Sequence, residues 1–358
     1  NASAGQSTLI ARDALESNLA KLERTVAERS TAGGTVSVKS QGEALLDHGA
    51  LIDLSGGSVQ YTAANLRTTL LTSGGKLIDI ADANSETRYD GIATRFVKDY
   101  GRWNVKEVIN LGQSYRYDPG YVEGKDAGTL SVVGMKTTAM DASVAGRTTT
   151  GALQRDAGNQ PRGAGLKLGT DKTATADEYK LNQRVVIGAA TPADINTLAL
   201  NPALFGQDKI ANLEVFSNQA AEVREALRLP QSGSISVTAK GVAVNADVIA
   251  QSGVLSFRAT DNVVNPAAVP LDVVVAEGVT LSAAGGWTND LPTAFGKSGQ
   301  AARVHGGAVT LSAVGEVALQ QGARVDVGGG GRLKADGKLL AGKAGKPTLE
   351  GNTVRLGS

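Results

Sequence analysis

The feature that most constrains the fold is a 25-residue segment that the chain contains twice. Residues 33–57 read GGTVSVKSQGEALLDHGALIDLSGG, and residues 306–330 read GGAVTLSAVGEVALQQGARVDVGGG. The two segments align without a gap at an offset of 273 residues, and 11 of the 25 positions are identical. A chain that repeats a segment in this way is expected to form the same packing unit more than once.

Each copy has the pattern of short strands separated by glycine. In the first copy, Val36 and Val38 alternate with polar residues, which is the period of two expected of a half-buried strand. Residues 51–54 predict another short strand. The glycines at 42, 49 and 56–57 predict turns, because glycine adopts the left-handed backbone conformations that other residues resist.

Weaker copies of this pattern occur at residues 232–257, 127–146 and 73–83. Self-similar units of roughly 20–30 residues that consist of strands predict a β-helix, in which stacked coils about 4.8 Å apart share one continuous core. A β-sandwich would have longer strands and more aromatic residues than the 4% found here. A propeller would repeat at about 40–45 residues with a Trp-Asp signature, which the sequence lacks.

The pattern breaks at the beginning of the chain. Residues 7–29 contain no Gly or Pro, and Leu15, Leu19, Leu22 and Val26 recur at helical spacing with charges between them. These residues predict one amphipathic helix. Its expected role is to cap or flank the open end of the solenoid, and binding a partner is the alternative.

The pattern breaks again at residues 86–126, which hold 7 of the chain's 14 aromatic residues. Within them, residues 92–110 are compatible with a helix. The segment either forms a small aromatic core of its own or presents a recognition surface, since Tyr, Trp and Arg dominate binding hot spots. The candidate ligand-binding residues are Tyr89, Arg95, Tyr100, Arg102, Trp103, Tyr115, Tyr117 and Tyr121. Aromatic rings stack on sugars, so a glycan is a candidate ligand. Nucleic acid is disfavoured because seven acidic residues offset the basic ones.

Residues 147–231 predict a second, irregular excursion. Strands are expected within 177–188 and 211–218, a loop with short helical turns at 191–206, and a short helix or turn at 219–230. The predicted division of the chain is a capping helix at 1–31, coils at 32–85, the aromatic excursion at 86–126, a coil at 127–146, the irregular excursion at 147–231, and coils at 232–358.

The sequence predicts neither a catalytic site nor a metal or cofactor site. The two histidines, His48 and His305, are far apart, there is no cysteine, and metalloprotease, EF-hand and nucleophile-elbow motifs are missing. Asp53 and Asp326 occupy equivalent positions in the two copies, so we expect them to cap turns. The net charge of +1 provides no strong attraction for nucleic acid, and no apolar run approaches the roughly 20 residues of a membrane span.

Two sets of residues resemble a known family. GALIDLSGGSV (49–59) and GARVDVGGGGRL (322–333) resemble the coil signature of filamentous-haemagglutinin-like exoproteins, the passengers of two-partner secretion in Gram-negative bacteria. YDGIATRFVKDYGRW (89–103) and YDPGYVEGKDAGTLSV (117–132) resemble a region of unknown function in some of these proteins. The coil resemblance covers about half of the chain, and no functional residue can be transferred from it.

The resemblance implies a right-handed parallel β-helix that forms part of a larger, monomeric, rod-shaped exoprotein. It implies export through an outer-membrane transporter, followed by a structural or adhesive role at the cell surface or in the medium, in contact with a glycan or a host-surface protein. The lack of cysteines suits such export. The alternatives are a polysaccharide lyase or hydrolase on the same fold, which would need converging carboxylates, and a stalk that carries a toxin located elsewhere in the parent chain.

Overall fold

A computed structural model describes most of the chain after residue 30. The described residues are 31–93, 95–110, 114–170, 181–188, 194, 196–260, 271–291 and 303–357. The helix predicted at residues 7–29 lies outside them. The described chain divides into two compact units. Residues 60–122 form one, which we call the inserted unit, and the remaining residues form the other, which we call the stacked-sheet unit.

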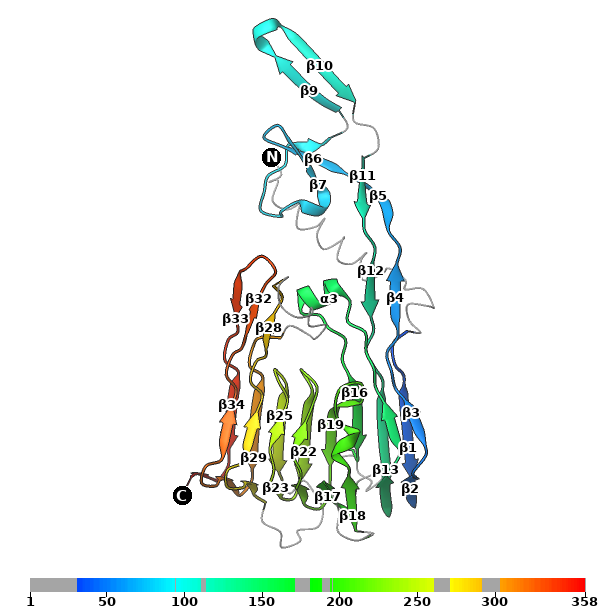
Figure 1. The fold of residues 1–358 in the computed structure, drawn as a ribbon, viewed down its shortest axis with the longest axis vertical. Helices are drawn as coiled ribbons and strands as arrows, with labels where there is room; N and C mark the ends of the chain where they lie inside the picture. The colour runs from blue at the N-terminus through cyan, green and yellow to red at the C-terminus, as the bar shows by residue number, and fades with distance from the viewer. Residues whose placement is uncertain are drawn as a thin grey trace, which may run out of the picture. The chain divides into compact units, whose positions relative to one another are not determined.

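The stacked-sheet unit is almost entirely β, with one short α-helix, α3 Ala152–Ala157, among its described residues, and is dominated by three parallel sheets (Figure 1). The first sheet contains, in spatial order, β1 Thr35–Ser40, β13 Thr129–Gly134, β16 Ala164–Leu168, β19 Ile210–Phe216, β22 Ser234–Ala239, β25 Val254–Ala259, β29 Ala308–Ala313 and β34 Lys346–Glu350. The second contains β18 Thr197–Leu200, β17 Arg184–Ile187, β20 Ala221–Val223, β23 Val242–Val244, β26 Val273–Val275, β30 Glu316–Leu319 and β35 Thr353–Leu356. The third contains β21 Leu227–Arg228, β24 Val248–Ile249, β27 Thr280–Ser282 and β31 Arg324–Asp326.

The two sequence copies form equivalent strands. In the later copy, β29, β30 and β31 lie in the first, second and third sheets. In the earlier copy, β1, β2 (Glu43–Leu46) and β3 (Leu51–Asp53) begin at the equivalent positions, and β2 and β3 pair in parallel with β14 (Thr137–Met140) and β15 (Ser143–Ala145). The repeat therefore predicted the strands and their spacing correctly.

One hydrophobic cluster joins the strands of the three sheets. Alternate residues of β25 and β29 point inward, so that Leu255, Phe257, Val309 and Leu311 are at most 1% exposed. Val36 is equivalent to Val309 but is 39% exposed. The difference arises because β1 is the last strand of the first sheet and pairs on one side only.

The glycines of the repeat serve two purposes, of which the sequence predicted one. Gly49 and Gly322 occupy equivalent positions and have φ of 90° and 73°, so the predicted left-handed turns are confirmed there. Gly253, Gly307 and Gly345 are different: a Cβ at any of them would collide with the carbonyl oxygen of the glycine that precedes the neighbouring strand of the first sheet. At these positions the missing side chain permits close approach between adjacent backbone segments, rather than a left-handed turn.

Gly307→Ala is expected to lower the free energy of unfolding by about 1–3 kcal/mol, because the added methyl group forces two backbones apart. Gly34→Ala is the matched control, since Gly34 is the equivalent residue of the first copy and a Cβ there meets no atom within 4 Å. Urea denaturation followed by circular dichroism measures both. Equal midpoints for the two variants would contradict the close-approach explanation.

Several predictions for residues 147–231 were wrong. The segment is not an excursion from the sheets, because β16 to β21 belong to the three parallel sheets. Residues 219–230 contain β20 and β21 rather than a helix. In residues 191–206 the 3₁₀ turn Pro202–Leu204 agrees with the predicted short helical turns, but the strand β18 was missed. The strands at 177–188 and 211–218 are confirmed as β17 and β19. The missed strands, β16, β18, β20 and β21, are two to five residues long and were too short for their alternation to be recognised.

The inserted unit consists of antiparallel pairs. β6 (Leu70–Ser73) pairs with β7 (Lys76–Asp79) and β8 (Gly91–Ile92), β5 (Ala64–Thr68) pairs with β11 (Ser114–Asp118), and β9 (Arg95–Tyr100) pairs with β10 (Val105–Asn110). The helix considered for 92–110 is therefore wrong, because β9 and β10 pair with each other in antiparallel register and the 3₁₀ turn Gly101–Trp103 separates them. The coil predicted at 73–83 is also wrong, since Gly74 and Gly75, at φ of 53° and 74°, turn β6 back into β7.

The boundaries of the excursion also differ from the prediction. It was expected to span 86–126, whereas the compact unit spans 60–122, and the boundaries fall within β4 (Ser58–Tyr61) and β12 (Tyr121–Gly124). Aromatic content marked the second half of the unit, but residues 60–85 contain only Tyr61 and resemble the coils in composition. Among the described residues, no helix is both long and apolar enough to cross a lipid bilayer.

Candidate functional site

The β9–β10 hairpin of the inserted unit presents a tryptophan at its turn. The 3₁₀ turn Gly101–Trp103 joins the strands, and Asn104 closes it at φ 50°, a left-handed conformation that asparagine tolerates better than most residues. This turn leaves Trp103 67% exposed. The hairpin therefore displays the indole to solvent instead of packing it into a core.

Two cations lie over aromatic rings next to this turn. Lys98 Nζ is 4.8 Å from the centre of the Tyr100 ring, and the guanidinium carbon of Arg102 is 5.8 Å from the centre of the Trp103 ring. The two rings are 6.4 Å apart and tilted by 56°. Tyr100 Oη donates a hydrogen bond to Glu107 Oε2 across the hairpin, at 3.2 Å. These contacts restrain the exposed side chains, so that less side-chain entropy is lost on binding.

A second exposed aromatic surface lies on the β5–β11 ladder. Tyr115 and Tyr117 alternate along β11, so both point to the same face, opposite Arg67 and Asn65 respectively. The two tyrosines are 59% and 64% exposed. A strand pair with an arginine and two tyrosines on one face has the residue types that dominate binding hot spots.

The remaining candidate residues have other environments. Tyr121 stacks on Tyr61 with ring centres 4.6 Å apart, and both rings are half-buried. Tyr89 is half-buried, and its hydroxyl accepts a hydrogen bond from the backbone N–H of Asn84 at 2.7 Å. The backbone of Arg95 pairs with Asn110, and its side chain lies outside the described atoms. Tyr61 was missed because it precedes the aromatic segment in sequence, although its ring lies against one of the predicted residues.

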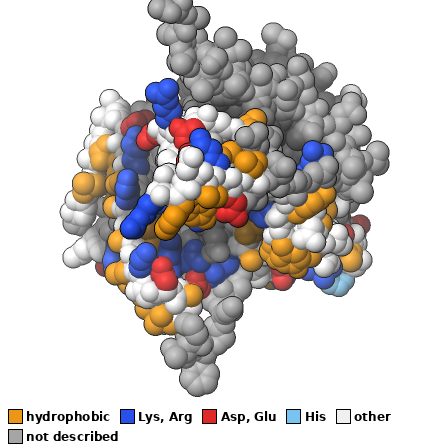
Figure 2. All heavy atoms as spheres, turned by 90° about the horizontal axis from the view of Figure 1, so that it is seen from above, with side chains coloured by type: hydrophobic (Ala, Val, Ile, Leu, Met, Phe, Trp, Pro, Cys, Tyr) orange, Lys and Arg blue, Asp and Glu red, His pale blue; other side chains and the backbone are white. Residues whose placement is uncertain are grey.

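The charges of the inserted unit are mixed. Residues 60–122 contain eight Lys and Arg residues and seven Asp and Glu residues. Some of them pair locally, as in the contact of 3.1 Å between Lys106 Nζ and Asp99 Oδ2. Figure 2 shows basic side chains interspersed with acidic and hydrophobic ones on one face of the molecule. A nucleic-acid surface would need a dense, continuous basic patch, so the mixed charges suit a ligand of another class.

The acidic residues of the repeat form turns, as expected. Asp53 Oδ1 accepts a hydrogen bond from Ser55 N at 2.9 Å, and Asp326 Oδ1 accepts one from Gly328 N at 3.0 Å. The bonds to Ser55 lower the pKa of Asp53. The equivalent bonds at equivalent positions identify both residues as turn caps.

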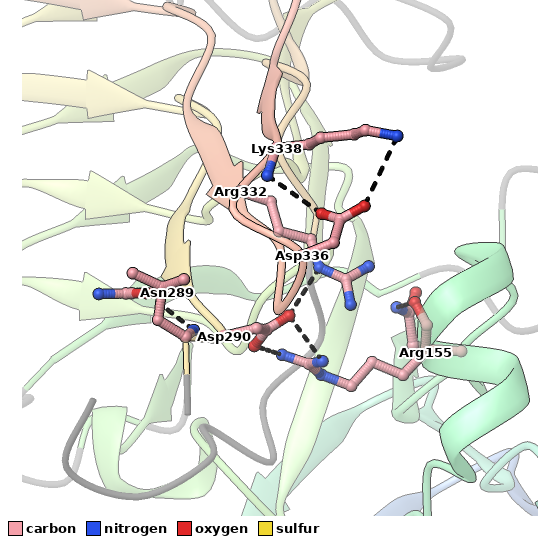
Figure 3. Close-up of polar contacts among 8 residues, drawn as sticks. Arg155, Asn289, Asp290, Arg332, Asp336 and Lys338 are labelled. Atoms are coloured by element: carbon pink, nitrogen blue, oxygen red, sulfur yellow. Dashed lines mark hydrogen bonds and ion pairs between the residues drawn. The ribbon is translucent and has the colours of Figure 1, made fainter. Parts of the chain in front are cut away.

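One buried acidic residue was not anticipated. Asp290 follows β28 (Trp287–Asn289) and lies between two arginines (Figure 3). Arg155, from the helix Ala152–Ala157, contacts its Oδ1 at 2.7 Å, and Arg332, from β32 (Gly331–Leu333), contacts its Oδ2 at 2.7 Å. The hydrogen bond from Arg155 and that from Arg332 lower the pKa of Asp290 to about 2, although partial burial opposes the shift.

This Arg–Asp–Arg cluster joins three segments that are distant in sequence. The three side chains are 10–17% exposed. A carboxylate held ionised by two arginines is a poor proton donor or acceptor near neutral pH. The arrangement therefore suits a structural role. No spacing in the sequence could have indicated it.

The histidines do not form a site. His48 Nδ1 lies 3.7 Å from Asp141 Oδ2 with both side chains largely exposed, and His305 Nδ1 accepts a hydrogen bond from Lys343 N at 2.9 Å. Within the described ranges, no group of three or more His, Cys, Asp or Glu residues is arranged to hold a metal ion.

Comparisons with known proteins add no relative. No protein family model, no curated protein and no solved structure matches the chain. The functional argument therefore depends on the fold and on the surfaces described above.

Proposed function

We propose that the chain is a structural and adhesive segment of a secreted or surface-displayed exoprotein, and that it acts by binding rather than by catalysis. In this proposal the stacked-sheet unit is a rigid support, and the inserted unit carries the contact surface. The partner is a glycan or a protein on a host surface, on a neighbouring cell or in a polysaccharide matrix.

The support is proposed to be a right-handed parallel β-helix. Three successive runs of the chain, β22–β24, β25–β27 and β29–β31, each visit the first, second and third sheets in the same order. Every pairing between these runs is parallel. A stack of coils of this kind is a stiff, extended support, because each coil is hydrogen-bonded to the next.

The observation that carries the binding proposal is the exposure of Trp103, Tyr115 and Tyr117. Each is 59–67% exposed, although burying a large aromatic ring in a core is strongly favourable. Exposed Trp and Tyr rings are characteristic of binding sites, where the ligand covers the rings in the complex. Arg102 over Trp103 and Arg67 opposite Tyr115 supply hydrogen-bond donors beside the rings. Rings flanked by donors suit the apolar faces and hydroxyl groups of a sugar, so a glycan is the first candidate.

The proposed cellular setting follows from the resemblance of the coils to filamentous-haemagglutinin-like exoproteins. In that setting the chain is exported from a Gram-negative cell with the help of an outer-membrane transporter. Parallel strands of two to seven residues and a lack of cysteines are compatible with a chain that folds only after export.

Trp103→Ala is expected to weaken binding to a glycan, identified on an array with the full chain, by about tenfold or more, because an aromatic anchor contributes 2 kcal/mol or more. Trp287→Ala is the matched control. Trp287 is the chain's other tryptophan, is 73% exposed, and lies in the stacked-sheet unit. Surface plasmon resonance measures the affinities, and circular dichroism checks that both variants are folded.

The two variants separate the proposal from a general effect of removing an exposed ring. Retention of binding by Trp103→Ala would remove the hairpin from the contact surface. Equal losses of affinity in both variants would indicate nonspecific hydrophobic binding rather than binding at a defined site. Failure of the folded chain to bind any glycan would direct the search to protein partners.

A further inference from the structure

A groove on the stacked-sheet unit collects polar groups that lack partners. Its volume is about 580 Å³, and it is open to solvent. Six of the residues that line it carry the argument: Gln160, Arg228, Gln231, Ser232, Gln251 and Arg303. All of them belong to one compact unit, so the groove does not depend on the position of the inserted unit.

The backbone of Arg303 is fixed at the edge of this groove. Its carbonyl oxygen accepts three hydrogen bonds, from Gly286 N at 3.0 Å, Gln231 Nε2 at 3.2 Å and Ser252 Oγ at 3.1 Å. The side chain is held by one bond, from Nε to Gln160 Oε1 at 2.9 Å. No carboxylate among the described residues pairs with this half-buried guanidinium, so its two terminal nitrogens remain available to a ligand.

The other charges of the lining leave the groove basic. The side chain of Arg228 is exposed and forms no hydrogen bond or ion pair with any described residue. Lys209 Nζ donates a hydrogen bond to the carbonyl oxygen of Ala203 at 2.7 Å. Asp208 is the only acidic residue in the described lining, against Lys209 and the two arginines.

Glutamines occupy equivalent corners of two successive coils. Gln231-Ser232 and Gln251-Ser252 each precede the glycine that begins the next strand of the first sheet, and both serines have left-handed φ, 62° and 53°. Gly286 leaves space for the two amides, since a Cβ there would lie 2.9 Å from Gln231 Nε2 and 3.6 Å from Gln251 Oε1. The repeat thus stacks two amides beside the arginines.

Two of these polar groups are buried without a hydrogen bond. Gln231 Oε1 and Ser232 Oγ have no partner among the described residues. Folded proteins leave few such groups, because each one costs about 1–3 kcal/mol. Their concentration in a groove with unpaired arginines indicates that a polar ligand completes the hydrogen bonding.

We propose that this groove binds an oligosaccharide that carries acidic groups. An acidic group pairs with the guanidinium groups of Arg303 and Arg228, whose planar donors match carboxylate and sulfate oxygens. The stacked amides of Gln231 and Gln251 hydrogen-bond the hydroxyls of successive sugars. The groove is separate from the aromatic surface proposed above, and it has no aromatic residue in its described lining, which distinguishes it from grooves that stack nucleobases.

The test is isothermal titration calorimetry of the full chain with four probes: an oligogalacturonate hexasaccharide, a heparin-derived hexasaccharide, the neutral maltohexaose and inorganic sulfate. We expect an acidic hexasaccharide to bind, with an affinity that falls as salt rises, and the other two probes to bind at least about tenfold more weakly. Oligogalacturonate carries carboxylates only, whereas heparin carries both uronates and sulfates. Binding of oligogalacturonate therefore indicates that carboxylates suffice, and binding of the heparin hexasaccharide alone indicates that sulfates are required.

Two variants locate the site. Arg303→Gln and Arg228→Gln are each expected to weaken binding of the acidic hexasaccharide by about tenfold or more, the cost of one charge-assisted hydrogen bond. Arg228→Gln keeps the test valid if Arg303→Gln perturbs folding, since Arg228 is exposed and unpaired. Arg258→Gln is the matched control, because it removes the same charge from an exposed position on β25.

Three results would overturn the proposal: no binding of either acidic hexasaccharide, equal binding of maltohexaose, or losses in Arg228→Gln no larger than in Arg258→Gln. Trp103→Ala separates this site from the aromatic surface. It is expected to leave the affinity for the acidic hexasaccharide unchanged even if it abolishes binding at the inserted unit.

Discussion

Phe257→Ala is expected to lower the free energy of unfolding by about 3–5 kcal/mol, among the largest effects of any single substitution in this chain. Phe257 is the largest fully buried side chain among the described residues and is 0% exposed. It lies on β25 between Val237 of β22 and Leu311 of β29, its register partners in the adjacent strands. Truncation opens a cavity that these neighbours cannot fill, because each is held in place by the backbone pairing of its own strand.

The measurement is urea denaturation of the full chain, followed by far-ultraviolet circular dichroism. Val254→Ala is the control, since Val254 lies on the same strand but is 47% exposed and points to solvent. It is expected to change stability by less than about 1 kcal/mol. Similar losses in the two variants would mean that β25 does not bury alternate residues, and would contradict the proposed packing of the coils.

Asp290→Asn is expected to lower the free energy of unfolding by about 3 kcal/mol at neutral pH, because it leaves Arg155 and Arg332 without their anionic partner. The three side chains are 10–17% exposed, so water compensates little for the lost charge. Asp336→Asn is the control. The side chain of Asp336 is more than half exposed and lies 3.7 Å from Lys338 Nζ. An exposed ion pair of this kind contributes less than about 1 kcal/mol to stability.

The contribution of Asp290 to the free energy of unfolding also depends on pH, and it decreases as the pH falls. The pKa of Asp290 is lowered from 3.8 to about 2 in the folded chain, so the folded state binds this proton less tightly than the unfolded state does. The ionised form therefore adds about 2 kcal/mol of stability above about pH 4, and this is lost as the pH falls towards 2.

Comparing the wild-type chain with Asp290→Asn isolates that contribution from the other carboxylates. We expect the stability difference between them to be constant from pH 7 to about 5 and to shrink as the pH falls towards 2. Chemical denaturation at a series of pH values measures it. A difference that stays constant down to pH 2 would show that the arginines do not hold Asp290 ionised.

The repeat allowed the strands of the stacked-sheet unit to be predicted well where its copies were clear. Alternation in residues 33–57 and 306–330 predicted equivalent strands, and the aligned Asp53 and Asp326 predicted equivalent turn caps. Both inferences depend on short-range geometry: a period of two sets the inward face, and an Asp side chain reaches the N–H two residues later. Such rules hold wherever the segment is placed in the fold.

Features that depend on neighbours distant in sequence could not be predicted in this way. Whether Trp103 is exposed depends on what else reaches its hairpin, and the sequence left both outcomes open. Residues 92–110 fit a helix until their pairing as β9 and β10 is known, because pairing decides the conformation of a short β-branched segment. Arg155, Asp290 and Arg332 meet only because the tertiary fold brings a helix and two strand segments together.

The sequence by itself determined the period of two, the inward-facing residues and the turn residues of the repeat, since these follow from the conformation of neighbouring residues along the chain. Only the tertiary structure decided which strand lies at the edge of a sheet, which glycines are required by backbone contact, and which polar groups meet in the groove. The physical reason is that pairing in a sheet is an interaction between strands distant in sequence: Val36 and Val309 occupy the same place in the repeat, yet one is exposed and the other buried.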